Sequence, residues 1–288
     1  MKEKFNSFMR KLLKPLDKIP NPIRDIVQFS IFFILFLVIA KNVFIDAYNI
    51  PSGSMEPTLL QGDFILANRL VYLIKDPYRG DIVNFVYPYQ EQYGRHLVEV
   101  PILKYFINPF IEVTFIKRVV GLPGDVIEFD NGFLKINGKP LKYKKVKETS
   151  NSVIYEEYIP SKVGIRKHLI KLSKNPQVPQ ARWGVYSGSI PSFACLKRSS
   201  LYPNWCQVIK VPKGYYFVMG DNRDASDDSR FWGFVKRDLI LSTPFVIYFS
   251  GKVPKLSPEN SNIFSGIAQF IHALFHPYFS RIGKPLIY

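Results

Sequence analysis

The segment from Ile50 to Leu59 contains two serine hydroxyls, on either side of one glycine, at a spacing that could serve nucleophilic chemistry. Ser52 and Ser54 flank a glycine, which allows another backbone to approach closely, and Pro57 stiffens the chain that follows. Taken alone, a Ser-Gly-Ser turn is more often an ordinary loop than a reactive site. A chemical role therefore requires a base that another element brings close to these hydroxyls.

Lys117 is the candidate base. It precedes Arg118 in an apolar run that reads as a strand, where alternation places the two side chains on opposite faces. At least one of these cations must then face apolar neighbours. A lysine tolerates burial by losing its proton, and the neutral amine can act as a base, whereas an arginine stays charged. The alternative is that Lys117 extends to water, as most strand lysines do.

A third polar cluster lies between residues 219 and 235, after another predicted strand, and is rich in acids, amides and arginines. It lacks the central glycine and the terminal glutamate of an EF-hand loop. We instead expect a buried scaffold of ion pairs and hydrogen bonds. Its candidate partners are Asp221, Arg223, Asp228 and Arg230.

Other catalytic schemes fit the chain poorly. A Gly-x-Ser-x-Gly elbow fails at Glu56, a Ser-x-x-Lys motif fails at Pro57, and neither His96 nor His168 lies in a recognisable Ser-His-Asp pattern. The chain has only four histidines and two cysteines, which argues against a multi-histidine metal centre or a four-thiolate zinc site. We predict no metal and no cofactor.

The segments that must position these residues read as short strands separated by turns. Alternating apolar residues predict strands over 81–87, 113–122, 126–129, 133–136, 215–219 and 239–249. Asn131 followed by Gly132 is a strong signal for a two-residue hairpin turn. No long helical period occurs between residues 50 and 250. The predicted fold class is mainly β, with an antiparallel catalytic core built from residues 46–134 and 211–250.

Residues 135–210 differ in composition and read as an inserted, basic, β-rich cap subdomain. Between Lys135 and Lys174 the chain holds eleven cations and three acids, and residues 1–25 hold seven cations and three acids. These regions carry twelve of the sixteen net positive charges. No helix-turn-helix, RNP or zinc-finger pattern is present. The charge therefore favours an anionic membrane surface, not nucleic acid, as the partner.

Residues 26–45 read as a transmembrane anchor. Ile26 to Ala40 is uncharged, and if Lys41 extends to the interface the apolar segment reaches about 30 Å, the thickness of a bilayer core. The basic lead of residues 1–25 would remain in the cytoplasm, and everything after residue 46 would lie outside. A signal peptide cleaved near Ala47 and a buried core helix are the alternatives.

The tail of residues 251–288 is expected to contain an amphipathic helix. Ser265, Gln269, His272 and His276 recur on one polar stripe, and we expect these histidines to face solvent or an interface. A second membrane span is a weaker alternative, because the stripe interrupts the apolar surface. In an exported body Cys195 and Cys206 could form a disulfide, with two free thiols as the alternative.

Taken together, the ordered motifs resemble those of the bacterial type I signal peptidases, the membrane-bound leader peptidases of the secretion pathway. The resemblance covers residues 26–135 and 210–250, in the order of that family. Behind the anchor it comprises Pro51-Ser-Gly-Ser-Met-x-Pro-Thr-Leu59, Arg79-Gly-Asp-Ile-Val-x-Phe85, Lys117-Arg-x-Val-Gly-Leu-Pro-Gly-Asp125 and Gly220-Asp-Asn-Arg-x-x-Ser-x-Asp-Ser-Arg230.

The resemblance implies a serine endopeptidase that uses a Ser/Lys dyad. Ser54 would be the nucleophile and Lys117 the general base. The Ser54 backbone N–H and the Ser52 hydroxyl would form the oxyanion hole, and Ser226 would orient the lysine amine. Asp221, Arg223, Asp228 and Arg230 would provide structural support beneath the site.

The resemblance also implies the substrate. Exported pre-proteins would bind as an added β-strand, with small residues at positions −1 and −3 in pockets that Ile50, Pro51 and Ile116 help to line. Cleavage would proceed through an acyl-enzyme ester that water hydrolyses. It would take place on the periplasmic face of a bacterial inner membrane, close to the translocon. Two alternatives stay open: another Ser/Lys peptidase such as a self-cleaving repressor, and a catalytically silent, membrane-tethered protein that binds exported peptides or scaffolds a translocon.

Overall fold

The computed structural model describes residues 22–23, 25–33, 44–89, 113–254 and 263–286, and it divides into two compact units, residues 1–45 and 46–288. In the first unit, residues 25–33 are helical. Residues 34–43 of the predicted anchor, and residues 1–21 and 24 of the predicted lead, lie outside the described residues. Among the residues that are described, no helix is both long enough and apolar enough to cross a membrane.

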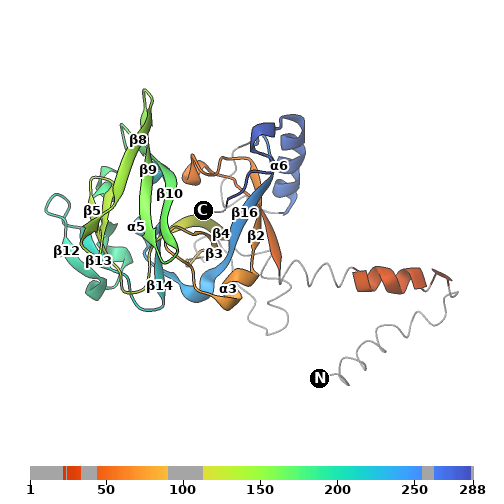
Figure 1. Cartoon of the computed structure of the whole chain (residues 1–288), viewed down its shortest axis with the longest axis horizontal. Coiled ribbons are helices and arrows are strands. Elements are labelled where there is room, and N and C mark those ends of the chain that lie inside the picture. Colours follow the sequence, from red (N-terminus) through yellow and green to blue (C-terminus); the bar gives the residue numbers. More distant parts are fainter. Residues whose placement is uncertain (1–21, 24, 34–43, 90–112, 255–262, 287–288) are drawn as a thin grey trace, which may run out of the picture. The chain divides into compact units, whose positions relative to one another are not determined.

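A seven-stranded sheet organises the second unit (Figure 1). In spatial order its strands are β1 (Ile45–Asn49), β2 (Asp63–Asn68), β16 (Ile240–Ser250), β3 (Ile82–Val86), β4 (Thr114–Gly121), β14 (Tyr215–Met219) and β15 (Val235–Lys236). Strand β16 pairs antiparallel with β2 and β3, and β4 pairs antiparallel with β3 and β14. The predicted strands over 81–87, 113–122, 215–219 and 239–249 thus correspond to β3, β4, β14 and β16.

A second sheet is built around the predicted hairpin. Asn131 and Gly132 both take positive φ, 47° and 89°, which a two-residue turn of this type requires and which glycine adopts without strain. The sheet contains β5 (Val126–Asp130), β6 (Phe133–Ile136), β7 (Lys139–Pro140), β11 (Val185–Tyr186) and β13 (Trp205–Lys210), with β12 (Cys195–Arg198) paired to β13. Its inward side chains form an apolar core with Phe217 of β14, so the two sheets share one interior.

A third sheet of three antiparallel strands lies within residues 135–210. It consists of β8 (Lys142–Glu148), β9 (Ser152–Ser161) and β10 (Gly164–Ser173). Its buried positions mix apolar side chains such as Ile159 and Ile170 with the charged or titratable Glu157 and His168. With three sheets and only short helices in the described body, the prediction of a mainly β, antiparallel fold is confirmed.

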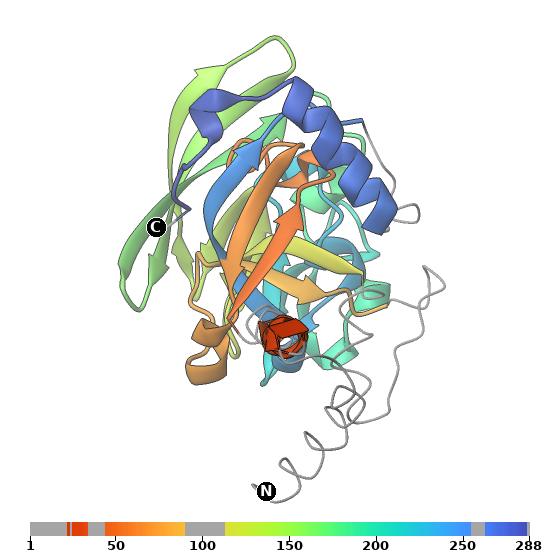
Figure 2. The ribbon, with the colours of Figure 1, turned by 90° about the vertical axis from the view of Figure 1, so that its right-hand side faces the viewer.

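The helices of the body are short connections apart from one near the C-terminus. They comprise α3 (Leu70–Ile74), α5 (Ser229–Trp232), α6 (Ile263–Phe275) and single 3-10 turns: η2 (Gly53–Met55), η4 (Pro179–Arg182), η5 (Ser187–Ser189), η6 (Ser192–Ala194), η7 (Arg223–Ala225), η8 (Arg237–Leu239) and η10 (Phe279–Arg281). Seen in Figure 2, α6 runs alongside the edge of the large sheet, next to β2 and β16. Its Phe270 packs edge-on against Phe64 of β2, with ring centroids 5.2 Å apart.

The polar stripe of α6 does not simply face solvent. His276 is exposed, as expected, but His272 is half-buried, and Gln269 is buried. Nδ1 of His272 lies 2.9 Å from the carbonyl oxygen of Lys252, and Nε2 of Gln269 donates to the carbonyl of Pro254 at 3.0 Å. The body draws the stripe inward because it offers these backbone acceptors at its edge.

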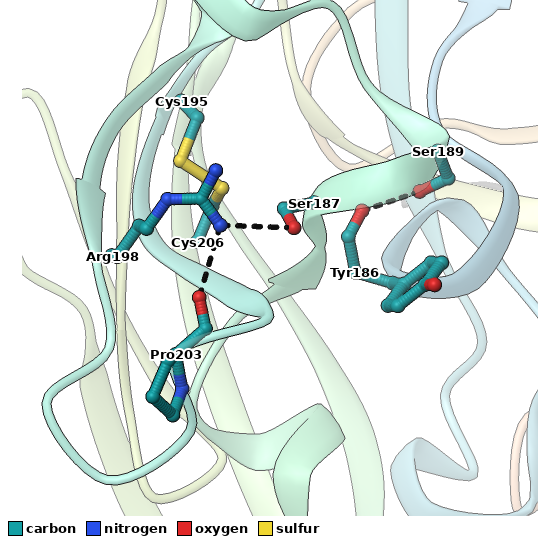
Figure 3. The surroundings of a disulfide bond; sticks show 7 residues. All are labelled: Tyr186, Ser187, Ser189, Cys195, Arg198, Pro203 and Cys206. Atoms are coloured by element: carbon teal, nitrogen blue, oxygen red, sulfur yellow. Dashed lines mark hydrogen bonds between the residues drawn. A yellow bond between two sulfur atoms is a disulfide. The ribbon is translucent and has the colours of Figure 1, made fainter.

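Cys195 and Cys206 form a disulfide between β12 and β13, with Cα atoms 5.5 Å apart (Figure 3). The adjoining loop is fixed by Arg198, whose Nη1 donates to the carbonyl of Pro203 at 3.0 Å and to Oγ of Ser187 at 3.2 Å. The expectation of a disulfide is confirmed, and it excludes two free thiols.

Candidate active site

Ser54 lies in the turn η2, shortly after β1, and its side chain is almost fully buried. One residue, Asn222, fastens this turn to the acidic loop that follows β14. Its backbone N–H donates to the carbonyl of Ser54 and its Nδ2 donates to the carbonyl of Gly53, both at 3.0 Å. Gly220 permits this close approach, since a Cβ there would lie 2.5 Å from the Ser54 carbonyl oxygen. Two segments far apart in sequence are thus joined at the candidate nucleophile.

Lys117 reaches the same point from β4. Its Nζ lies 2.8 Å from Oγ of Ser54, at hydrogen-bond distance, and the side chain is only 4 % exposed. The ring of Phe115 covers the amine from one side, with Nζ 5.5 Å from the ring centroid. Burial lowers the pKa of Lys117 to about 8, although the carboxylates of Asp228, Asp227 and Asp221 partly oppose the shift. A hydroxyl and an amine with a lowered pKa are therefore in direct contact.

Lys117 and Arg118 are both buried, so the alternative in which Lys117 extends to water is wrong. The two residues accommodate burial differently. Arg118 keeps its charge through a two-fold pair with Asp221, in which Nε and Nη2 lie 2.8 and 2.7 Å from the two carboxylate oxygens. Its Nη1 also donates to the carbonyl of Gly80 at 2.8 Å. The arginine thereby fixes the strand that presents the lysine.

Asp228 and Arg230 form the predicted pair beneath the site. Nε and Nη2 of Arg230 each lie 2.8 Å from one oxygen of Asp228, and both residues are buried. Asp228 also accepts from the backbone N–H of Gly220 at 3.0 Å and caps the short helix α5. Arg230 Nη2 additionally donates to the carbonyl of Arg223. These contacts hold the loop after β14 against η2, the turn that contains Ser54.

Two further charged residues support this loop, and sequence reasoning missed both. Glu157 of β9 lies under Arg223, with Oε1 2.6 Å from its Nη2, and it also lies 3.0 Å from Nε2 of His168 on β10. All three are buried. Burial alone would raise the pKa of Glu157, but Arg223 and His168 outweigh it and hold that pKa well below its usual range. The signal in the sequence was weak: Glu157 shares a strand face with the apolar Ile159.

The network continues into the core of the site. Nε2 of His168 lies 4.0 Å from Asp221, the partner of Arg118, and the backbone N–H of Lys171 donates to the carbonyl of Asp221 at 2.8 Å. Burial, and then the positive charge of Arg118, lower the pKa of His168. The third sheet is therefore connected, through buried charges, to the strand that carries Lys117.

Ser52 and Ser226 lie beside the pair but do not contact it in the same way. Oγ of Ser52 lies 3.4 Å from Oγ of Ser54, so a second hydroxyl borders the candidate nucleophile. Ser226 is buried against Gly220, where an added Cβ would lie 2.2 Å from its Oγ. Among the described contacts, no hydrogen bond joins Ser226 to Lys117. The structure therefore brings Ser226 to the site without a bond that would orient the amine.

The residues predicted to line the substrate pockets lie near η2, the turn that contains Ser54. Ile50 is buried in an apolar cluster that also includes Met55, next to Ser54, and the partly buried Ile116 packs against this cluster. Pro51, between Ile50 and the turn, is half-buried. The cluster is completed by Leu59, Ile65, Ile82, Ile247 and Leu286, with Tyr48 packed against it.

Comparison with known proteins finds a matching family model and similar chains. The family model described as "Signal peptidase, peptidase S26" matches residues 23–249. The chain is 43% identical to signal peptidase I of Aquifex aeolicus (strain VF5), with 88% of this chain and 96% of the relative covered, and 33% identical to signal peptidase I of Pseudomonas fluorescens, with 79% and 73% covered. A crystal structure of a signal peptidase I from Enterococcus faecalis V583 covers 59% of this chain and 97% of its own at 24% identity, with a TM-score of 0.29.

Proposed function

The chain belongs to the peptidase S26 family of signal peptidases, and from this membership and the contact between Ser54 and Lys117 we propose that it removes signal peptides from exported pre-proteins with a Ser/Lys dyad. It is a serine endopeptidase. The observation that carries the proposed mechanism is the 2.8 Å distance between Nζ of Lys117 and Oγ of Ser54 inside a buried site.

In the proposed reaction, neutral Lys117 accepts the proton of Ser54 as Oγ attacks the scissile carbonyl carbon. The negative charge that develops on the carbonyl oxygen is stabilised by the backbone N–H of Ser54 and the hydroxyl of Ser52, each donor contributing about 3 kcal/mol in comparable sites. Protonated Lys117 then donates to the leaving amine, which releases the mature protein. Water, activated by the same amine, hydrolyses the ester that remains on Ser54.

The substrate is proposed to bind as an extended strand beside the nucleophile turn. Backbone hydrogen bonds would supply the affinity, and shallow apolar pockets near Ile50, Pro51 and Ile116 would select small side chains at positions −1 and −3. Support comes from the packing of Ile116 against the cluster that contains Ile50 and Met55, the residue after Ser54. Closely packed isoleucines at this place would leave room only for small substrate side chains.

We place the body on the outer face of the bacterial plasma membrane, close to the translocon, with residues 26–45 as its anchor and the N-terminus in the cytoplasm. The uncharged run of residues 26–40 and the basic lead support this topology. The disulfide between Cys195 and Cys206 is in keeping with an oxidising compartment. The basic regions would favour anionic lipid headgroups.

Substitution of the dyad tests the mechanism. Ser54→Ala and Lys117→Ala are each expected to abolish cleavage of a pre-protein with a small-x-small site, because one removes the nucleophile and the other its base. The measurement is cleavage by the purified full-length chain, with circular dichroism to verify that the β structure is intact. Lys162→Ala, which alters an exposed lysine at the turn between β9 and β10, is the matched control and should retain activity. Robust cleavage by either dyad variant would overturn the assignment.

A further inference from the structure

Lys171, near the end of β10, brings the third sheet to η2, the turn that contains Ser54. Its backbone N–H donates to the carbonyl of Asp221 at 2.8 Å, and the residue forms a parallel bridge with Asn222. Asn222 in turn donates to the carbonyls of Gly53 and Ser54. The contacts of Lys171 with the acidic loop use its backbone, so they do not depend on the chemistry of its side chain.

The side chain of Lys171 forms an ion pair with Glu56, two residues after Ser54. Nζ lies 3.0 Å from Oε2 of Glu56, and each side chain is 31% exposed. The carboxylate lies against Gly53, because a Cβ added to this glycine would lie 2.7 Å from Oε1 of Glu56. Gly53 separates Ser52 from Ser54, the two residues proposed to stabilise the oxyanion. Glu56 therefore holds a negative charge beside the place where further negative charge develops.

A carboxylate in this position opposes the reaction unless a cation balances it. Like charges a few ångströms apart repel, and the repulsion grows where water is excluded. The turn η2 is such a place, since Ser54 and Met55 are both buried. A paired carboxylate and ammonium have little net charge between them, so Lys171 removes most of the repulsion while Glu56 stays in place.

We propose that Lys171 offsets the charge of Glu56 at η2 and thereby allows Ser52 and Ser54 to stabilise the oxyanion fully. Lys171 is a positioning residue, because it acts through Glu56 and not on the reacting atoms. The inserted cap subdomain thus contributes a side chain to the rate of cleavage. The proposal rests on the proposed function, and in particular on its oxyanion hole.

The test removes each charge separately and then both together. Lys171→Met, Glu56→Gln and the double variant are prepared in the full-length chain, and kcat and KM are measured on a pre-protein with a small-x-small site. Assays at about pH 9, above the pKa of Lys117 of about 8, keep that amine largely neutral in every variant. Lys135→Met is the matched control: Lys135 pairs with Glu128 at 2.9 Å in the second sheet, and the two side chains are 37% and 35% exposed.

We expect Lys171→Met to lower kcat about fivefold and to change KM less than about twofold, because the unbalanced carboxylate opposes charge that exists only in the transition state. Glu56→Gln should raise kcat about twofold, since the cation then remains beside the developing negative charge. The double variant should return kcat to within about twofold of the native value. Lys171→Arg, which keeps the charge, and the control Lys135→Met should both retain the native kcat.

Two results would contradict the proposal. A native kcat in Lys171→Met would show that the charge of this lysine has no bearing on the reaction. Equal losses of kcat in Lys171→Met and Glu56→Gln, without recovery in the double variant, would show that the ion pair only links β10 to η2 mechanically. Recovery in the double variant also excludes misfolding as the cause of the loss in Lys171→Met.

Failure of the proposed function would look different. Cleavage that survives Ser54→Ala contradicts the Ser/Lys dyad, and with it the oxyanion hole on which the role of Lys171 depends. Cleavage that requires Ser54 but proceeds with a native kcat in Lys171→Met contradicts the role of Lys171 alone.

Discussion

Lys117 and Arg118 show how two adjacent cations can be buried for different purposes. Arg118 remains charged because Asp221 meets it with both oxygens, whereas Lys117 has no carboxylate at bonding distance among its described contacts and faces Ser54. Burial in such a setting favours the neutral amine, which a base requires. The pH dependence of cleavage should therefore reflect the pKa of this single side chain.

The cleavage rate is expected to rise with pH through the pKa of Lys117, about 8. Below that pH the amine is protonated and cannot accept the proton of Ser54, so kcat/KM should fall about tenfold per pH unit. The measurement is kcat/KM on a short peptide substrate across this range, with unfolding followed at each pH as a control. A rate that stays constant from mildly acidic to neutral pH would contradict the role of Lys117.

For single residues, the sequence indicated which types could react and which strand face each side chain occupies. It did not indicate which residues form ion pairs with one another. Strand alternation correctly separated Lys117 from Arg118, and motif order brought Ser54 to attention. The partner of Arg118, by contrast, is Asp221, 103 positions away. Such pairings depend on how strands cross in space, which no local pattern encodes. The pairing of Glu157 with Arg223 was unpredicted for the same reason.

Strands β9 and β10 contribute more to the candidate site than their basic composition suggests. Glu157 and His168 are buried at the face that meets the acidic loop, where they contact Arg223 and approach Asp221. A buried pair is costly to break from one side, because the remaining charge has neither water nor a partner. The third sheet therefore acts as a support for the loop that holds η2, the turn that contains Ser54.

Glu157→Gln is expected to destabilise the body by about 3–5 kcal/mol, since it leaves the buried guanidinium of Arg223 without its carboxylate. Denaturant unfolding at neutral pH provides the measurement. Glu156→Gln is the matched control: this carboxylate is adjacent in sequence, points to the opposite face of β9 and is half-buried, so its loss should cost less than 1 kcal/mol. Equal losses of unfolding free energy in the two variants would contradict the stabilising role of the buried pair of Glu157 and Arg223.

Elements with a strong local signal were predicted to within a residue or two. The turn at Asn131 and Gly132 determines the hairpin of β5 and β6, and the ends of β16 follow from its apolar run. For helix α6, the local signal predicted the element but not which of its side chains face the body. Its periodicity revealed a helix, but the acceptors that draw Gln269 and His272 inward belong to Lys252 and Pro254, outside the helix.

For the molecule as a whole, the disulfide fixes a part of the second sheet that is remote in sequence from Ser54. Cys206 is fully buried in the core shared by the two larger sheets, and the bond closes a short loop between β12 and β13. Closing a loop of this size stabilises a fold mainly by restricting the unfolded chain. The bond should therefore matter for stability and not for catalysis.

The double variant Cys195→Ala with Cys206→Ala is expected to lose about 2–3 kcal/mol of unfolding free energy, the amount that closure of a loop of roughly a dozen residues provides. Unfolding of the variant is compared with that of the native chain, with and without reductant. Cleavage under non-denaturing conditions should be unchanged. Reductant should lower the stability of the native chain alone, and an equal effect on the variant would argue against the bond.

The apolar cluster behind Ser54 joins residues from both ends of the body. Ile50 and Leu286 belong to it together and stand 236 positions apart, and the backbone N–H of Leu286 donates to Phe245 of β16 at 2.9 Å. During biosynthesis the serine turn therefore emerges long before Ile247 and Leu286, which complete the cluster. The packing of this cluster can be finished only after translation has passed residue 286.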